Sequence, residues 1–258
     1  MSVRICVLGS GSGGNCTLVA TERTRLLVDA GFSFREIQQR LRKIGEEPGR
    51  VDAVLITHEH SDHVAGLQTL AKKLKKPIFV TPLTESRLDW GDTEPLLEKF
   101  HAGQRWMIGD IQIDSFTIPH DAVDPVAFCF RAEGMKLGVV TDLGYMPESV
   151  KQQVRGCQLL VLESNHDLDM LKVGPYPWFV KQRVMSRVGH LSNHAVSEFL
   201  EADYDRGSQV LVLAHLSEQN NHPEIARLTA TQALRGAGAQ GTRLVLAEQR
   251  HPTEVFRF

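Results

Sequence analysis

The chain has 258 residues, of which 42% are hydrophobic and 23% are charged, a composition typical of a globular protein. Its formal net charge of −2 argues against a basic protein that coats nucleic acid without regard to sequence. The first apolar stretch is too short for a signal peptide, and no run approaches the roughly 18 apolar residues of a membrane span. We therefore expect a cytoplasmic protein with reduced cysteines and no membrane partner, folded as a single domain over residues 1–258.

Short apolar runs alternate with helical patterns along the chain. Six runs rich in Val, Ile and Leu end in polar clusters and predict buried strands: Val3–Leu8, Arg25–Val28, Ala53–Thr57, Leu137–Thr141, Leu159–Leu162 and Val210–Ala214. Alternation at Ile111, Ile113 and Phe116 predicts a more exposed antiparallel pair, and Leu244–Phe256 fits a final strand. Helical patterns occupy Phe34–Ile44, His63–Leu74, Pro147–Val154, Ala195–Glu201 and Pro223–Gly236. The order predicts an α/β protein with mixed sheets covered by helices.

A glycine-rich loop, Gly9–Asn15, follows the first predicted strand. It lacks the Gly-Lys-Ser/Thr ending of a phosphate-binding P-loop, and the strand-like Thr17–Ala20 follows it rather than a helix. We therefore expect a tight hairpin. Its backbone N–H groups can line a substrate cleft, and we include Asn15 among the candidate substrate-binding residues.

The strongest chemical signal is the segment His58-Glu59-His60-Ser61-Asp62-His63, which directly follows a predicted strand. Alternate side chains of an extended segment point the same way, so His58 and His60 can face one ion. His63 opens a helical pattern, and the bend there can aim Asp62 and His63 at a neighbouring point. Imidazole nitrogen and carboxylate oxygen are ligands that suit zinc and manganese.

Three later residues, His120, Asp142 and His215, each stand where an apolar run stops. Taken alone, Asp142 could be a helix cap and His215 a buried structural histidine. Ligands of α/β proteins bind beyond strand ends, and all three residues share that placement with the first motif. The shared placement favours metal ligation for the set.

These motifs resemble the metallo-β-lactamase fold. Five further segments resemble its YycJ (WalJ) subgroup of bacterial cytosolic hydrolases: Gly9–Asn15, His120–Pro125, Leu162–Asp167, Gly189–Asn193 and His215–Asn221. The resemblance runs from Val3 to about Arg227. It implies an αββα sandwich, in which two mixed β-sheets are flanked by helices, with a dinuclear site in the cleft between the sheets.

The resemblance also implies a ligand set for two divalent ions, with Zn²⁺ favoured and Mn²⁺ the alternative. One ion would take His58, His60 and His120, the other would take Asp62, His63 and His215, and Asp142 would bridge them. Two carboxylates and a hydroxide would offset only part of the metal charge. The remaining positive charge favours an anionic phosphodiester over a neutral amide.

The remaining polar residues of these segments are expected to support catalysis. By comparison with phosphodiesterases of this fold, His190 would protonate the leaving group, with Asp62 as a second catalytic residue. A structural turn histidine is the alternative for His190. Asp29, Glu163 and His166 are expected to orient the metal ligands.

Residues Leu171–His190 combine basic and aromatic side chains and contain no acid. Such a combination suits a surface that follows a nucleic-acid backbone and stacks its bases. The alternative is a solvated helix with its aromatic residues in the core. We include Lys181 and Arg183 of this stretch, and Asn193 beyond it, among the candidate substrate-binding residues.

Together these features predict a metal-dependent phosphodiesterase that acts on nucleic acid through a local basic patch. We expect DNA rather than RNA as the substrate, exonuclease action, and a nucleophilic hydroxide activated by two metal ions. The alternative is a thioester or small-ester hydrolase, similar to glyoxalase II, on the same dinuclear site. The basic stretch and His190 favour the phosphodiesterase.

Overall fold

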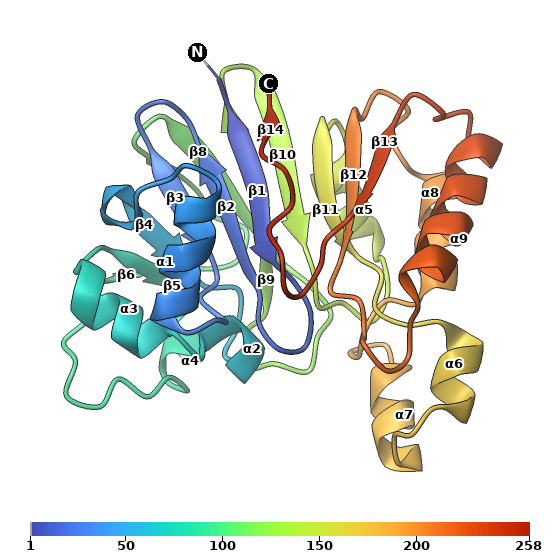
Figure 1. The fold of residues 1–258 in the computed structure, drawn as a ribbon, viewed down its shortest axis with the longest axis horizontal. Helices are drawn as coiled ribbons and strands as arrows, with labels where there is room; N and C mark the ends of the chain where they lie inside the picture. Colours follow the sequence, from blue (N-terminus) through green and yellow to red (C-terminus); the bar gives the residue numbers. More distant parts are fainter. Residues whose placement is uncertain (1) are drawn as a thin grey trace.

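The computed structural model describes residues 2–258, which form two seven-stranded β-sheets (Figure 1). The first sheet contains, in spatial order, β14 (Phe256–Arg257), β1 (Arg4–Gly9), β2 (Cys16–Ala20), β3 (Arg25–Val28), β4 (Ala53–Leu55), β5 (Ile78–Val80) and β6 (Leu97–Lys99). Its strands are antiparallel from β14 to β3 and parallel from β3 to β6. The glycine-rich loop connects β1 and β2 as the expected hairpin.

The second sheet is also mixed. In spatial order it contains β13 (Arg243–Leu246), β12 (Val210–Ala214), β11 (Leu159–Glu163), β10 (Met135–Val140), β9 (Val126–Ala132), β8 (Ile111–Thr117) and β7 (Arg105–Ile108). The strands β10 to β13 are parallel, and β7 to β10 are antiparallel. The predicted antiparallel pair is β7 and β8, of which β7 is the exposed edge strand and β8 is largely buried.

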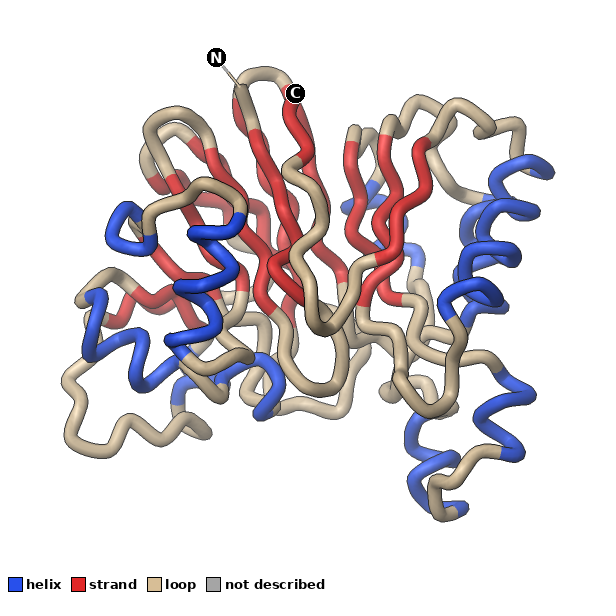
Figure 2. The backbone as a smooth tube through the Cα atoms, in the orientation of Figure 1, coloured by secondary structure: helices blue, strands red, loops and turns tan. Residues whose placement is uncertain are grey.

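Helices cover the outer faces of both sheets, as Figure 2 shows. The first sheet packs against α1 (Phe34–Lys43) and α3 (Leu67–Leu74), and the second against α5 (Glu148–Val154), α8 (Asn193–Ala202) and α9 (Pro223–Gly236). The shorter helices are η1 (Pro48–Arg50), α2 (Ser61–Val64), α4 (Pro82–Glu85), α6 (Leu168–Val173) and α7 (Trp178–Val184). No helix in residues 2–258 is long and apolar enough to cross a bilayer.

The layers are held together by three groups of buried apolar side chains. The central group lies between the two sheets and includes Leu26, Phe128 and Val161. The outer groups join each sheet to its helices, as Leu41 does in the first and Leu200 in the second. The αββα sandwich of two mixed sheets is therefore confirmed.

Two predicted elements differ from the structure. The helix expected over His63–Leu74 is divided into α2 and α3 at Gly66, whose N–H donates to Ala30 O at 2.8 Å. The strand expected over Leu244–Phe256 is two short strands, because β13 extends the second sheet and the chain then crosses to pair β14 with β1 in the first. Both departures arise from contacts with segments far away in the sequence.

The division at Gly66 yields a stability prediction. A Cβ atom at this position would lie 1.8 Å from Phe32 O, so Gly66→Ala must displace backbone. We expect a loss of about 1–3 kcal/mol in the free energy of unfolding, measured by urea denaturation. Gly236→Ala is the control, because nothing lies within 4 Å of its added Cβ. An equal effect of both substitutions would contradict the proposed close approach.

Candidate metal centre

Strands of both sheets stop at the lower end of the sandwich in Figure 1, and the candidate ligands follow these strand ends. The strand β4 leads into the segment 58–63, β8 leads to His120, β10 to Asp142 and β12 to His215. Asp142 and His215 adopt left-handed backbone angles, with φ of 62° and 55°. Residues other than glycine rarely adopt this conformation, and it is often found at functional sites.

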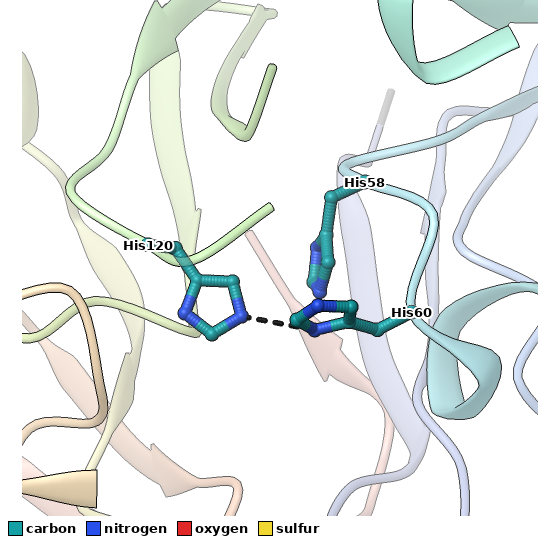
Figure 3. Close-up of side chains that lie close together, drawn as sticks. All are labelled: His58, His60 and His120. Carbon is teal, nitrogen blue, oxygen red and sulfur yellow. Dashed lines mark hydrogen bonds between the residues drawn. The ribbon is translucent and has the colours of Figure 1, made fainter. Parts of the chain in front are cut away.

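Three histidine rings converge in the first cluster, which consists of His58, His60 and His120 (Figure 3). His120 Nε2 lies 3.1 Å from His60 Nδ1, and His120 Nδ1 donates to Gly189 O at 3.2 Å. Burial lowers the pKa of His58 well below its ordinary value, which favours the neutral imidazole. Its buried Nε2 has no hydrogen-bond partner among the described residues.

Asp62, His63 and His215 form the second cluster. His215 Nε2 lies 3.2 Å from Asp62 Oδ2, and His63 Nε2 lies 3.5 Å from the same oxygen. Burial would raise the pKa of Asp62, but hydrogen bonds from His215 and His63 more than reverse this and lower it. Asp62 is therefore a carboxylate that lies between two imidazoles.

Asp142 lies between the two clusters. Its Oδ2 is 3.2 Å from His63 Nε2, and its Oδ1 is 4.0 Å from His120 Nε2. Burial raises the pKa of Asp142, but the surrounding histidines, above all His215 and His63, hold it well below its ordinary value. This carboxylate can therefore serve both clusters at once.

The donor atoms fit divalent metal ions. Buried polar atoms are nearly always paired, yet within residues 2–258 His58 Nε2 and Asp142 Oδ2 have no hydrogen-bond partner. Three imidazole nitrogens lie within 4.8 Å of one another in the first cluster, and two imidazole nitrogens and a carboxylate oxygen do so in the second. Such crowding of nitrogen and oxygen donors is typical of zinc and manganese sites, and these residues can hold divalent metal.

Asp29 supports two of these histidines. Its Oδ2 accepts a hydrogen bond from His63 Nδ1 at 2.8 Å. The Thr57 hydroxyl donates to Asp29 and lies 2.9 Å from His58 Nδ1. Both imidazoles are thereby held with Nδ1 turned away from the cluster and Nε2 free to bind a ligand. The structure thus places Asp29 where an orienting residue is needed.

Asp29→Asn tests this support. The asparagine side chain cannot accept from both Thr57 and His63, because one of its two oxygens is replaced by an N–H donor. We expect metal affinity about 10- to 100-fold weaker in a competition assay with a chelator. Asp110→Asn is the matched control, since Asp110 also accepts from threonine hydroxyls but contacts neither cluster. Unchanged metal affinity in Asp29→Asn would contradict the orienting role.

Glu163 links His215 to His190. Its Oε1 accepts from His190 Nδ1 at 2.8 Å and from His215 Nδ1 at 2.9 Å, and its Oε2 accepts from two backbone N–H groups. Burial raises the pKa of Glu163, but the adjacent His190 and His215 outweigh burial and lower it to about 2. Burial alone would lower the pKa of His190, but the Glu163 carboxylate outweighs burial and raises this pKa above its ordinary value. His190 is therefore held by Nδ1, and Glu163 stabilises its protonated form relative to that of a free histidine.

A cleft of about 320 Å³ opens onto these groups. Asp62, His190 and His215 line it together with Ser12 of the glycine-rich loop and Arg183 of α7. A larger cavity, of about 540 Å³, lies beside α9 and residues 246–251, and none of the clustered metal-binding side chains lines it. The smaller cleft is therefore the candidate active site.

The four expected substrate-binding residues have different positions. Arg183 lines the cleft and forms an ion pair with Asp121. Lys181 is 8% exposed and donates from Nζ to Lys172 O at 2.7 Å, so its ammonium group is turned into the α6–α7 pair. The structure does not bring Lys181 to the cleft, because the ammonium group pairs with the carbonyl at the end of α6 instead.

The two asparagines are both buried. Asn15 Nδ2 lies 3.1 Å from both Asp62 Oδ2 and His63 Nε2, so this side chain contacts the candidate metal ligands themselves. Asn193 is 3% exposed and is bonded to Ser164 and Asn221 beneath the site. Asn193 thus packs below the cleft, which it does not line.

His166 is also buried, and neither of its ring nitrogens has a hydrogen-bond partner among the described residues. Burial lowers its pKa to about 4. It forms no hydrogen bond to a clustered histidine, in contrast to Asp29 and Glu163.

Two residues that the sequence analysis missed, Thr57 and Asp121, contact the site, and each stands next to a candidate ligand in the sequence.

Comparison with known proteins agrees with this geometry. The family described as "Beta-lactamase superfamily domain" matches residues 24–216. Exodeoxyribonuclease YycJ of Bacillus anthracis is 35% identical over 246 residues, covering 92% of this chain and 91% of that protein. Exodeoxyribonuclease WalJ of Streptococcus pneumoniae serotype 2 (strain D39 / NCTC 7466) is 35% identical over 233 residues, covering 88% and 87%. Among solved structures, the metallo-β-lactamase fold protein YhfI from Bacillus subtilis aligns over 100% of both chains, with a TM-score of 0.76 and 18% identity.

The sandwich of two mixed sheets and the histidine–aspartate clusters at its end define a metal-dependent hydrolase of the metallo-β-lactamase fold. The chain belongs to the beta-lactamase superfamily and, within it, to the group that contains YycJ and WalJ.

Proposed function

We propose that the protein is a phosphodiesterase that degrades nucleic acid, and that it acts as a DNA exonuclease in the cytoplasm. The observation that carries this proposal is the position of His190, which lines the cleft beside the clustered ligands and is held by Glu163. The names of two relatives, both exodeoxyribonucleases that match most of the chain, support DNA as the substrate. The four cysteines are free, as expected for a reducing compartment.

Seven side chains would hold two divalent ions, for which we favour Zn²⁺ with Mn²⁺ as the alternative. His58, His60 and His120 would hold the first ion, Asp62, His63 and His215 the second, and Asp142 would contribute to both. Two such ions, when bound, lower the pKa of water and offset the negative charge of a phosphodiester. The chain itself supplies orientation, proton transfer and contacts with the substrate.

His190 would donate a proton to the oxygen that leaves. Its Nδ1 is bonded to Glu163, so Nε2 is the nitrogen available to a ligand in the cleft. A sugar alkoxide is a strong base and leaves slowly unless it is protonated, whereas a thiolate leaves readily, because a thiol has a pKa of about 8.5. A protonated histidine at this place therefore favours a phosphodiester over a thioester substrate.

Asp62 and Arg183 would act on the other groups of the substrate. Asp62 lines the cleft as a carboxylate and would orient the attacking water by accepting a hydrogen bond from it. The Arg183 side chain is 64% exposed at the cleft and would contact a phosphate oxygen. Asp121, which pairs with Arg183 in the absence of substrate, would be displaced in that exchange.

A substrate panel tests the proposal. Protein reconstituted with Zn²⁺ or Mn²⁺ is given end-labelled single- and double-stranded DNA and RNA, bis-p-nitrophenyl phosphate and a glutathione thioester. We expect metal-dependent hydrolysis of the phosphodiesters, with DNA degraded from an end. Hydrolysis of the thioester with no cleavage of any phosphodiester would overturn the proposal in favour of a thioesterase.

A further inference from the structure

The helix pair α6–α7 projects beyond the helical layer, at the lower right of Figure 1. It carries exposed apolar side chains. Val173 is 87% exposed, Trp178 is 64% exposed and Phe179 is 72% exposed. Within residues 2–258, no other Phe, Trp or Tyr side chain is as exposed as those of Trp178 and Phe179. Exposed apolar groups that gather in one place mark a binding surface more often than isolated ones do.

This aromatic pair adjoins the candidate active site. Val180, Arg183 and Val184 of the same helix line the cleft that opens onto the metal-binding residues. Phe179 precedes Arg183 by four positions, so the two residues lie on one side of α7, about 6 Å apart along its axis. A chain molecule that leaves the cleft past Arg183 therefore meets Phe179 next.

The charge around the aromatic pair favours a polyanion. Residues 168–190 contain four basic side chains, Lys172, Lys181, Arg183 and Arg187, and one acid, Asp169. Lys172 pairs with Asp169 and Lys181 is buried. Arg183 pairs with Asp121 at the cleft, and Arg187, just beyond α7, lies over the Tyr145 ring without an acidic partner among the described residues. Flat apolar rings next to cations match the two parts of a nucleotide, the base and the phosphate.

We propose that Phe179, with Trp178 beside it, is a stacking platform for the base next to the scissile phosphate. The inference rests on the proposed function and adds a substrate class to it: a strand whose terminal bases are unpaired. A paired base is held in the duplex beside its partner, whereas an unpaired terminal base is free to turn its whole face onto a projecting ring. The enzyme therefore takes single-stranded ends in preference to blunt duplex ends.

The test compares Phe179→Ala with Phe179→Tyr, which keeps an aromatic face. Leu228→Ala on α9 is the matched control, because Leu228 is 59% exposed and lies outside this helix pair. We expect Phe179→Ala to bind and process single-stranded DNA about 5- to 150-fold less well, chiefly through KM. Phe179→Tyr and Leu228→Ala should remain near the wild type. Hydrolysis of bis-p-nitrophenyl phosphate, which is too small to reach Phe179, should be unchanged in all three.

A second measurement does not depend on hydrolysis. Single-stranded oligonucleotide added to the metal-free protein should quench tryptophan fluorescence, and Trp178→Phe should remove most of that signal. Unchanged binding of single-stranded DNA by Phe179→Ala would overturn the platform. A second contrary result would be that Phe179→Ala binds DNA normally but no longer self-associates in sedimentation. That result would identify a second copy of the chain as the occupant. If the wild type cleaves no phosphodiester at all, the proposed function fails. The platform is then still tested by comparing the affinities of Phe179→Ala and the wild type for single-stranded DNA.

Discussion

Replacing Asp142 with asparagine should lower both metal content and phosphodiester hydrolysis, the latter by at least about 100-fold. Asp142 lies between the two clusters of metal-binding side chains and is held as a carboxylate by the histidines around it. Asparagine removes its negative charge and replaces one oxygen with a donor, so it cannot serve two cations. Asparagine also tolerates the left-handed backbone of position 142, so the fold should survive.

Metal analysis and initial rates on labelled DNA check this result, with circular dichroism to confirm folding. Asp114→Asn is a suitable control, because Asp114 is a buried carboxylate of the same sheet that pairs with Arg105 and Arg131 far from the site. That control should lose some stability and keep its metal. If Asp142→Asn keeps its full metal content and rate, the two-ion assignment is wrong.

His190→Ala should lose about 10²- to 10⁴-fold in the rate of DNA hydrolysis while keeping its metal. His190 is bonded through Nδ1 to Glu163 and lines the cleft, so the substitution removes the proposed proton donor and no proposed metal ligand. The loss on bis-p-nitrophenyl phosphate should be far smaller, because p-nitrophenolate leaves without a proton.

The comparison of the two substrates separates the roles open to His190. His194→Ala should change neither rate, since His194 is exposed on α8 and pairs only with Glu198. Equal losses on both substrates would assign His190 to positioning or charge stabilisation. The absence of any loss would make it a structural histidine of the turn before α8.

Local spacing made much of the site predictable. The segment from His58 to His63 is contiguous, and its alternation and bend follow from the end of a strand and the start of a helix. The later candidates were recognised because each follows an apolar run, and in the structure such runs end at the same edge of the sandwich. The register of β11 on β12 pairs Glu163 with Ala214, which explains how Glu163 reaches the neighbouring His215.

The rest depends on how distant segments pack. Charge alone suggested Lys181 as a phosphate contact, but the arrangement of α6 and α7 turns its ammonium group onto Lys172 O. Periodicity alone predicts one helix over α2 and α3, but the helix breaks before Gly66, which is the N-cap of α3 and lies against the backbone at Phe32. Nothing in the local sequence of Asn193 shows that Ser164 and Asn221 surround it. Such contacts are tertiary, and patterns within one segment do not contain them.

Titration of the metal-free protein tests whether side chains from both sheets hold two ions for phosphodiester hydrolysis. Zn²⁺ or Mn²⁺ is added in steps, and bound metal and hydrolysis of labelled DNA are measured on the same samples. We expect no hydrolysis without metal and a maximal rate at about two ions per chain. Full activity in the metal-free protein, or saturation with two ions and no cleavage of DNA or any other phosphodiester, would contradict this role of the two ions.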